Sequence, residues 1–115
     1  MDIGILEFKV KSNTYTIKFP NVGQIEDIEC NKQLISKGMY ASLMQMNTKA
    51  ANDALDMIDM EAFFSILCPD IVKDLKCDSF RDLGVVDYME LKKSYIDQFV
   101  PWWTKIQKIL RPIDE

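Results

Sequence analysis

The stretch ILEFKVKSNTYTIKFP (residues 5–20) alternates apolar and polar side chains on both sides of a short polar break. Alternation with a period of two is typical of a strand that buries one face. The break, Ser12-Asn13, has residue types that favour tight turns. We therefore expect an antiparallel hairpin over residues 3–19, ended by Pro20. Its apolar side chains are Leu6, Phe8 and Val10 in the first strand and Tyr15, Ile17 and Phe19 in the second.

After Pro20 the apolar spacing changes to three and four residues, which is the period of an α-helix. Asn21 and Gln24 have the spacing of an N-terminal capping box, and Gly38 is suited to end a helix. Pro69 fits the first position of a helix. These signals predict helices over about residues 22–37, 40–47, 50–67 and 69–75.

A last helix is expected over about residues 88–110, with Asp87 and Glu90 as its capping pair. Pro101 should kink or break this helix, because proline donates no backbone hydrogen bond and its ring opposes the carbonyl four residues earlier.

The expected fold class is therefore α+β: an N-terminal two-stranded antiparallel hairpin followed by about four helices packed as a small bundle, mainly α. The chain has 115 residues, 48% of them hydrophobic, and no long linker, so a single domain over residues 1–115 is expected. An isolated hairpin is marginally stable in water. Both edges of the hairpin are expected to be available to a further strand.

Composition argues against several classes of function. The chain has no histidine, so it cannot by itself form a Ser-His, Cys-His or histidine-ligated metal site. Its net charge of -4 is unfavourable for nucleic-acid binding. Neither a signal-peptide pattern nor a membrane-length apolar run occurs, so no membrane association is expected. The odd count of 3 cysteines without a CxxC pair favours a reducing cytoplasm.

The acidic and thiol groups give weak candidates for chemistry. Asp53, Asp56 and Asp59 recur every third residue, which we interpret as a solvated helix face rather than a metal site. Cys68 is expected to be buried, Cys30 to be buried or at a helix margin, and Cys77 to be the most exposed. We therefore expect no catalytic residues, no cofactor and no metal, and predict that the chain is not an enzyme.

Methionines and adjacent tryptophans are in excess, and they suit a surface that adapts to an apolar protein partner. The alternative is ordinary packing in the core. Trp103 fits the helical stripe of Phe99 and Ile106, so Trp102 is expected to face outward. The candidate partner-binding residues are Met44, Met46, Met57, Met60, Phe64 and Trp102.

The order of these segments resembles a known family. The chain has Tyr15-Thr16-Ile17-Lys18-Phe19-Pro20, then Val22-Gly23-Gln24 leading to Ile28-Glu29, and a late Pro101-Trp102-Trp103. This layout resembles the tail assembly chaperones of tailed bacteriophages. The resemblance implies a non-enzymatic protein that coats the apolar helical tape-measure protein, in the cytoplasm of the infected bacterial host or, if retained, in the virion. The open hairpin and the surplus of methionine and aromatic residues favour self-association, and we expect a homo-oligomer. The alternatives are a small structural virion subunit for head or tail completion, or an acidic inhibitor of a host defence protein.

Overall fold

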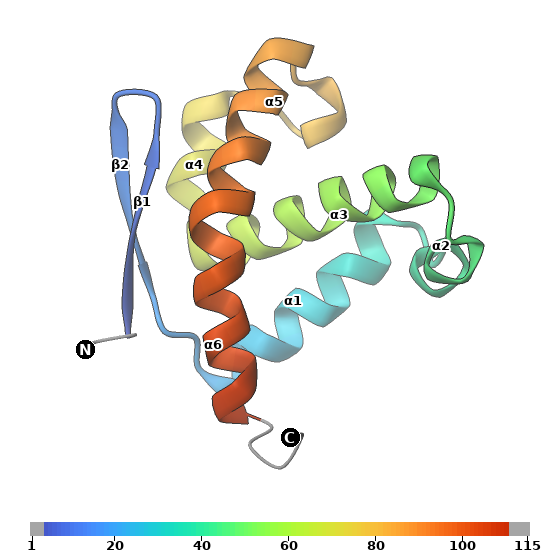
Figure 1. Cartoon of the computed structure of the whole chain (residues 1–115), viewed down its shortest axis with the longest axis horizontal. Coiled ribbons are helices and arrows are strands. Elements are labelled where there is room, and N and C mark those ends of the chain that lie inside the picture. The colour runs from blue at the N-terminus through green and yellow to red at the C-terminus, as the bar shows by residue number, and fades with distance from the viewer. Residues whose placement is uncertain (1–3, 111–115) are drawn as a thin grey trace. The chain divides into compact units, whose positions relative to one another are not determined.

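The computed structural model describes residues 4–110, which form two compact units. The hairpin unit comprises residues 4–19 and 84–110, and the helical unit comprises residues 20–83. The chain has the expected mainly α, α+β class, with one hairpin followed by helices (Figure 1). The expectation of a single domain over residues 1–115 stays a prediction.

In the hairpin unit, β1 (Ile5–Val10) pairs antiparallel with β2 (Asn13–Lys18). The turn lies one residue earlier than the sequence suggested, because Lys11 rather than Asn13 adopts a positive φ of 56°. Phe8 and Ile17, on the apolar face, are fully buried. The predicted start of the hairpin at residue 3 lies outside the described residues.

The hairpin packs beside one long helix, formed by α5 (Val85–Ser94), the π-helical segment η2 (Tyr95–Phe99) and α6 (Val100–Leu110) (Figure 1). This helix begins at Val85 rather than at residue 88, since Gly84 is its N-cap. The expected capping role of Asp87 is therefore wrong. Asp87 lies in the first turn, where its carboxylate pairs with the Lys11 ammonium at 2.8 Å, and Glu90 pairs with the same ammonium at 3.2 Å.

Pro101 does not break this helix, contrary to one of the two outcomes expected from the sequence. The π-helical segment ends at Phe99, and Val100, the residue between Phe99 and Pro101, donates its N–H to the Tyr95 carbonyl. The hydrogen-bond ladder thus shifts by one residue at the place where proline cannot donate. The helix continues on the far side of Pro101 to Leu110.

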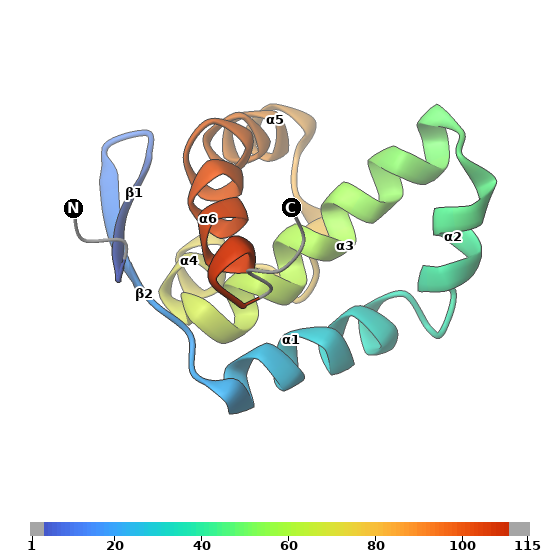
Figure 2. The same cartoon turned by 60° about the horizontal axis from the view of Figure 1, so that its bottom comes forward.

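The helical unit contains α1 (Val22–Ile35), α2 (Tyr40–Met46), α3 (Lys49–Leu67), α4 (Pro69–Leu75) and the 3-10 turn η1 (Phe80–Asp82). Figure 2 shows α2 connecting the end of α1 to the start of α3. The predicted capping box is present: the Gln24 N–H donates to Asn21 Oδ1 at 2.8 Å, and the Asn21 N–H donates to Gln24 Oε1 at 3.0 Å. Gly38 lies in the turn that follows α1 and has a φ of 79°, which agrees with the helix end expected at this glycine.

The core of the helical unit surrounds α3, which contacts α1, α2, α4 and η1. Helices that are apolar around most of their circumference are expected at such central positions. Phe64 of α3 lies against Phe80 of η1, with ring centroids 6.3 Å apart. The buried side chains of α3 are Ala51, Ile58, Met60, Ala62, Phe63 and Phe64.

Candidate functional site

The candidate site is built on α2, a short helix that has no buried residue. Its Tyr40 and Leu43 are half-buried, and α2 contacts α3. Residues three apart on a helix share a face, so Tyr40 and Leu43 form the stripe by which α2 is seated on the unit.

A polar cluster holds this stripe in place. The Tyr40 hydroxyl donates to Asp59 Oδ1 of α3 at 2.6 Å. Lys32 of α1 places its ammonium 3.8 Å from Asp59 Oδ1 and 3.2 Å from Glu29 Oε2. The same ammonium lies 5.4 Å above the centroid of the Tyr40 ring and 5.2 Å from that of Phe63. One cation thus joins α1, α2 and α3 through ion pairing and cation–π attraction.

Burial is the main cause of the raised pKa values of Asp59 and Tyr40. It raises the pKa of the Asp59 carboxyl above its ordinary value, although the Tyr40 hydrogen bond and the Lys32 charge act in the opposite direction. The pKa of the Tyr40 phenol is also raised, by burial and by the adjacent carboxylate of Asp59. The sequence-based view of Asp59 as part of a solvated face is therefore wrong, since its side chain is only 23% exposed.

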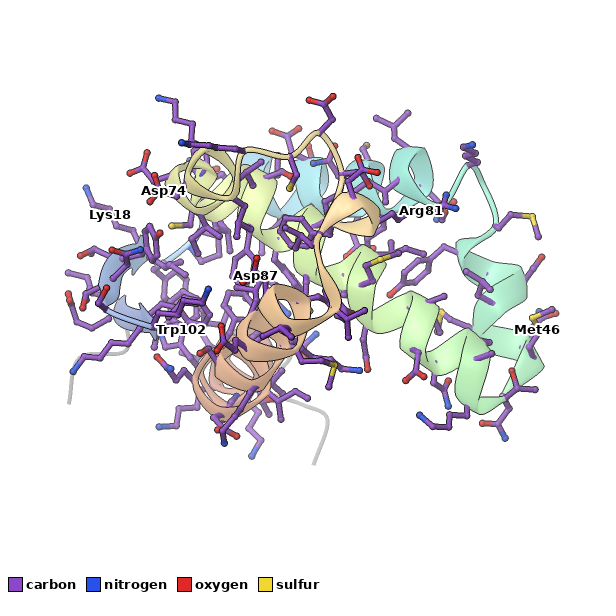
Figure 3. The ribbon with its side chains drawn as sticks, turned by 90° about the horizontal axis from the view of Figure 1, so that it is seen from above. Lys18, Met46, Asp74, Arg81, Asp87 and Trp102 are labelled. Atoms are coloured by element: carbon purple, nitrogen blue, oxygen red, sulfur yellow. The ribbon has the colours of Figure 1, made fainter. Side chains whose placement is uncertain are left out.

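Methionines flank the seated stripe of α2. At about 100° per residue, Met44 and Met46 lie on opposite sides of the Tyr40 and Leu43 stripe. Both are exposed, at 60% and 59%, and Met39 at the N-cap is 49% exposed. Figure 3 shows the Met46 side chain on the outer side of α2. We call Met39, Met44 and Met46 the methionine surface.

The structure separates the predicted contact residues into two groups. Met44 and Met46 belong to the methionine surface, and Met57 is half-buried on the neighbouring α3. The others are core residues: Met60 and Phe64 have no exposed surface, and Trp102 is 6% exposed. The expectation of a contact surface that includes these buried side chains is corrected accordingly, because a side chain without exposed area has none to offer a partner.

The two tryptophans exchange their expected positions. Trp102 is buried, whereas Trp103 is half-buried and stacks on Phe99 at a centroid distance of 5.8 Å. Trp102 meets the same Phe99 ring edge-on at 5.7 Å. Spacings of three and four residues from Phe99 both fit one helix face, so the sequence pattern did not distinguish the two rings.

Sequence reasoning missed the part that Met39 plays at the site, and it missed the cluster beneath it. Met39 lies seven residues before Met46, a spacing that places two side chains near one face of a helix. That spacing was readable from the sequence. The contacts of Asp59 with Tyr40 and Lys32 join three helices and had no local signal.

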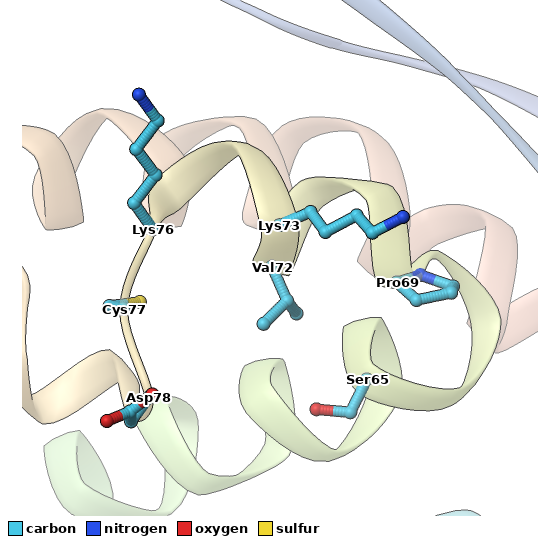
Figure 4. Close-up of a pocket in the computed structure, with 7 residues that line it drawn as sticks. All are labelled: Ser65, Pro69, Val72, Lys73, Lys76, Cys77 and Asp78. Atoms are coloured by element: carbon cyan, nitrogen blue, oxygen red, sulfur yellow. The ribbon is translucent and has the colours of Figure 1, made fainter.

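A separate open pocket of about 430 Å³ lies on the surface of the helical unit, between α3, α4 and the segment after α4 (Figure 4). Ser65, Val72 and Cys77 lie on its wall, and the Lys76 ammonium points away from it (Figure 4). Burial and the nearby carboxylates of Glu61, Asp82 and Asp78 raise the pKa of the Cys77 thiol. This thiol therefore stays protonated at neutral pH, which disfavours nucleophilic chemistry.

The exposure of the cysteines differs from the sequence-based expectation. Cys68 is buried as expected, but Cys30 is the exposed thiol and Cys77 is half-buried. Within residues 4–110, no three cysteine or carboxylate side chains are grouped as a metal ion would require. No helix in that range combines the length and the apolar composition needed to cross a membrane.

Comparisons with known proteins find no relative of the chain. No known protein family matches the sequence, and neither a curated protein nor a solved structure is significantly similar to the chain.

Proposed function

We propose that the chain is a non-enzymatic protein-binding factor of bacteriophage tail assembly, a chaperone that holds an apolar helical partner such as the tape-measure protein. It would act in the cytoplasm of the infected cell. The family resemblance of the sequence suggests the pathway, and the methionine surface supports the binding mode.

One observation carries the proposal: α2 exposes two methionines, its N-cap Met39 is a third exposed one, and none of the residues of α2 is buried. Flexible thioether side chains adapt to differently shaped apolar surfaces, as promiscuous helix-binding proteins require. The Tyr40–Asp59 hydrogen bond and the Lys32 cation keep α2 in position, so the methionines are presented on an anchored helix. Anchoring lowers the conformational entropy that binding would otherwise lose.

The test is co-purification with a tape-measure fragment from the same phage. The variant Met44→Lys/Met46→Lys should lose at least about tenfold in affinity, since each buried methionine contributes roughly 1.5–3 kcal/mol to association. Met89→Lys is the matched control, because Met89 is also exposed, at 54%, but lies on α5. Retention of the fragment by the double variant at wild-type affinity would refute the binding site.

The same experiment separates the proposal from the alternative roles. Absence of the chain from purified phage particles, measured by mass spectrometry, is expected of a chaperone. Its stoichiometric presence would instead identify a structural subunit. Failure of the wild-type chain to retain the fragment would contradict the chaperone role itself.

A further inference from the structure

The two edges of the hairpin differ. The Phe19 N–H donates to the Gly4 carbonyl at 2.7 Å, so residues 4 and 19 form a hydrogen-bonded pair. Antiparallel pairs alternate between hydrogen-bonded and non-hydrogen-bonded. The register therefore directs the backbone groups of Ile5, Glu7 and Lys9 to the outer edge of β1, and those of Thr14, Thr16 and Lys18 to the outer edge of β2.

The outer edge of β1 is covered by the long helix at Lys9, whose backbone groups are hydrogen-bonded to a side chain of that helix. The Lys9 N–H donates to Gln98 Oε1 at 2.8 Å, and Gln98 Nε2 donates to the Lys9 carbonyl at 2.8 Å. A side-chain carboxamide thus makes the two bonds that a neighbouring strand would make. Beside it, β1 packs against α5 and η2.

The β2 edge is open within residues 4–110. The sheet has two strands, and Thr14, Thr16 and Lys18 are all exposed. Among the described residues, their outward backbone groups accept and donate no hydrogen bond. An unpaired edge rich in β-branched residues is a template for another strand.

We propose that the β2 edge is a self-association surface, at which β2 of a second copy pairs antiparallel about a twofold axis at Thr16. In this register Thr16 faces Thr16 of the second copy, and Thr14 faces Lys18. Threonine pairs are favourable across strands, and the two Lys18 ammonium groups lie at opposite ends, about 14 Å apart. The self-complementary pattern favours a second copy over a foreign strand.

The buried face supports the same register. Tyr15 of one copy lies opposite Ile17 of the other, and both side chains are on the face that carries Phe8. Aromatic and β-branched side chains are favourable cross-strand partners. The pairing thus joins the two hairpins into a four-stranded sheet. This inference is independent of the proposed tape-measure binding.

Sedimentation equilibrium over a wide concentration range tests the surface. A six-residue edge is a small interface, so a weak, concentration-dependent dimer is expected. Thr16→Pro removes an outward N–H that β1 does not use, and should weaken the dimer at least about tenfold. Thr16→Val keeps the N–H and is the matched control, expected to stay within about threefold of wild type. A chain that is monomeric throughout, or a Thr16→Pro variant that dimerises like wild type, overturns the proposal.

A cross-linking experiment tests the register even if Thr16→Pro impairs folding. Two separate variants are made in a Cys30→Ser/Cys77→Ser background. Thr16→Cys and Thr14→Cys each place one exposed thiol on the β2 edge, at different positions. A thiol cross-linker spanning about 5 Å should join Thr16→Cys dimers, whose facing Cα atoms are about 5.5 Å apart. It should not join Thr14→Cys dimers, whose thiols are about 14 Å apart. Equal cross-linking of the two variants, or none of Thr16→Cys, overturns the twofold pairing.

Discussion

The Gln98 side chain and the Lys9 backbone are joined by two hydrogen bonds of 2.8 Å, one in each direction. They connect residues 89 positions apart in the sequence and fix the hairpin on the long helix. A carboxamide has one acceptor and two donor hydrogens, so it satisfies both backbone groups of one residue at once.

Gln98→Ala should therefore lower the free energy of unfolding by about 1–2 kcal/mol, since it removes two hydrogen bonds of ordinary strength. Urea denaturation measures this loss, and the exchange rate of the Lys9 amide should rise at least about tenfold. Gln107→Ala is the matched control, because Gln107 is exposed on the same helix and its side chain makes no hydrogen bond among the described residues. Equal effects of the two variants would show that the pairing with Lys9 contributes nothing.

The methionines of the core and of the surface should respond differently to truncation. Met60→Ala should cost about 2–4 kcal/mol, because Met60 is fully buried and its removal leaves a cavity. Met46→Ala should change the free energy of unfolding by less than about 0.5 kcal/mol, since Met46 is exposed. The comparison uses urea denaturation of both variants. A costly Met46→Ala would place Met46 in the core and remove it from the methionine surface.

The Asp59 carboxyl should make stability depend on pH in the acid range. Its folded-state pKa is raised by burial, so the folded chain binds the proton more tightly than the unfolded chain does. The resulting stabilisation is fully present below the unfolded pKa of about 3.9, and is lost as pH rises through the raised folded pKa. The free energy of unfolding of wild type, minus that of Asp59→Asn, should therefore fall over this window.

Asp27→Asn is the control for the pH series, because Asp27 is exposed on α1 and its replacement also removes one negative charge. A difference between wild type and Asp59→Asn that rises with pH would contradict the sign. It would mean that Tyr40 and Lys32 stabilise the Asp59 carboxylate more than burial destabilises it.

Thiol labelling should follow the exposure of the three cysteines. Cys30 is exposed and should react first with a maleimide, whereas buried Cys68 should react at least about a hundredfold more slowly, because it needs a local opening. Burial also raises the pKa of the Cys68 thiol and lowers its thiolate fraction. Mass spectrometry of partly labelled chains gives the order, and labelling in denaturant should remove it. Fast labelling of Cys68 in the native chain would contradict the described core.

Local sequence signals predicted the elements well. Alternation gave the hairpin, and Asn21 with Gln24 marked the start of α1, because these signals arise from neighbouring residues. The last helix was predicted too short at its start, since Asp87 has a capping residue's chemistry but is used in an ion pair with Lys11. That ion pair depends on the folding of the hairpin against the helix, which no local pattern encodes.

The candidate site was predicted only in part, because exposure is decided by packing between helices. Met44 and Met60 are chemically identical, yet one is exposed and the other lies within the core around α3. Which side of an apolar helix is covered depends on its neighbours, so the sequence yields the excess of methionine but not its distribution.

The residues at the two ends of α2 affect how freely the sequence of this helix can change in evolution. Gly38 and Asn47 adopt positive φ angles of 79° and 51°, so left-handed residues bound the helix on both sides. Asn47 ends α2 and Gly38 separates it from α1, because a left-handed residue does not continue a right-handed helix. Provided that Tyr40 and Leu43 are kept, the outward side chains of α2 are free to diverge without loss of the fold. If α2 binds a partner as we propose, a partner preference can be altered within its seven residues, and α2 is the segment to exchange when a new preference is to be engineered.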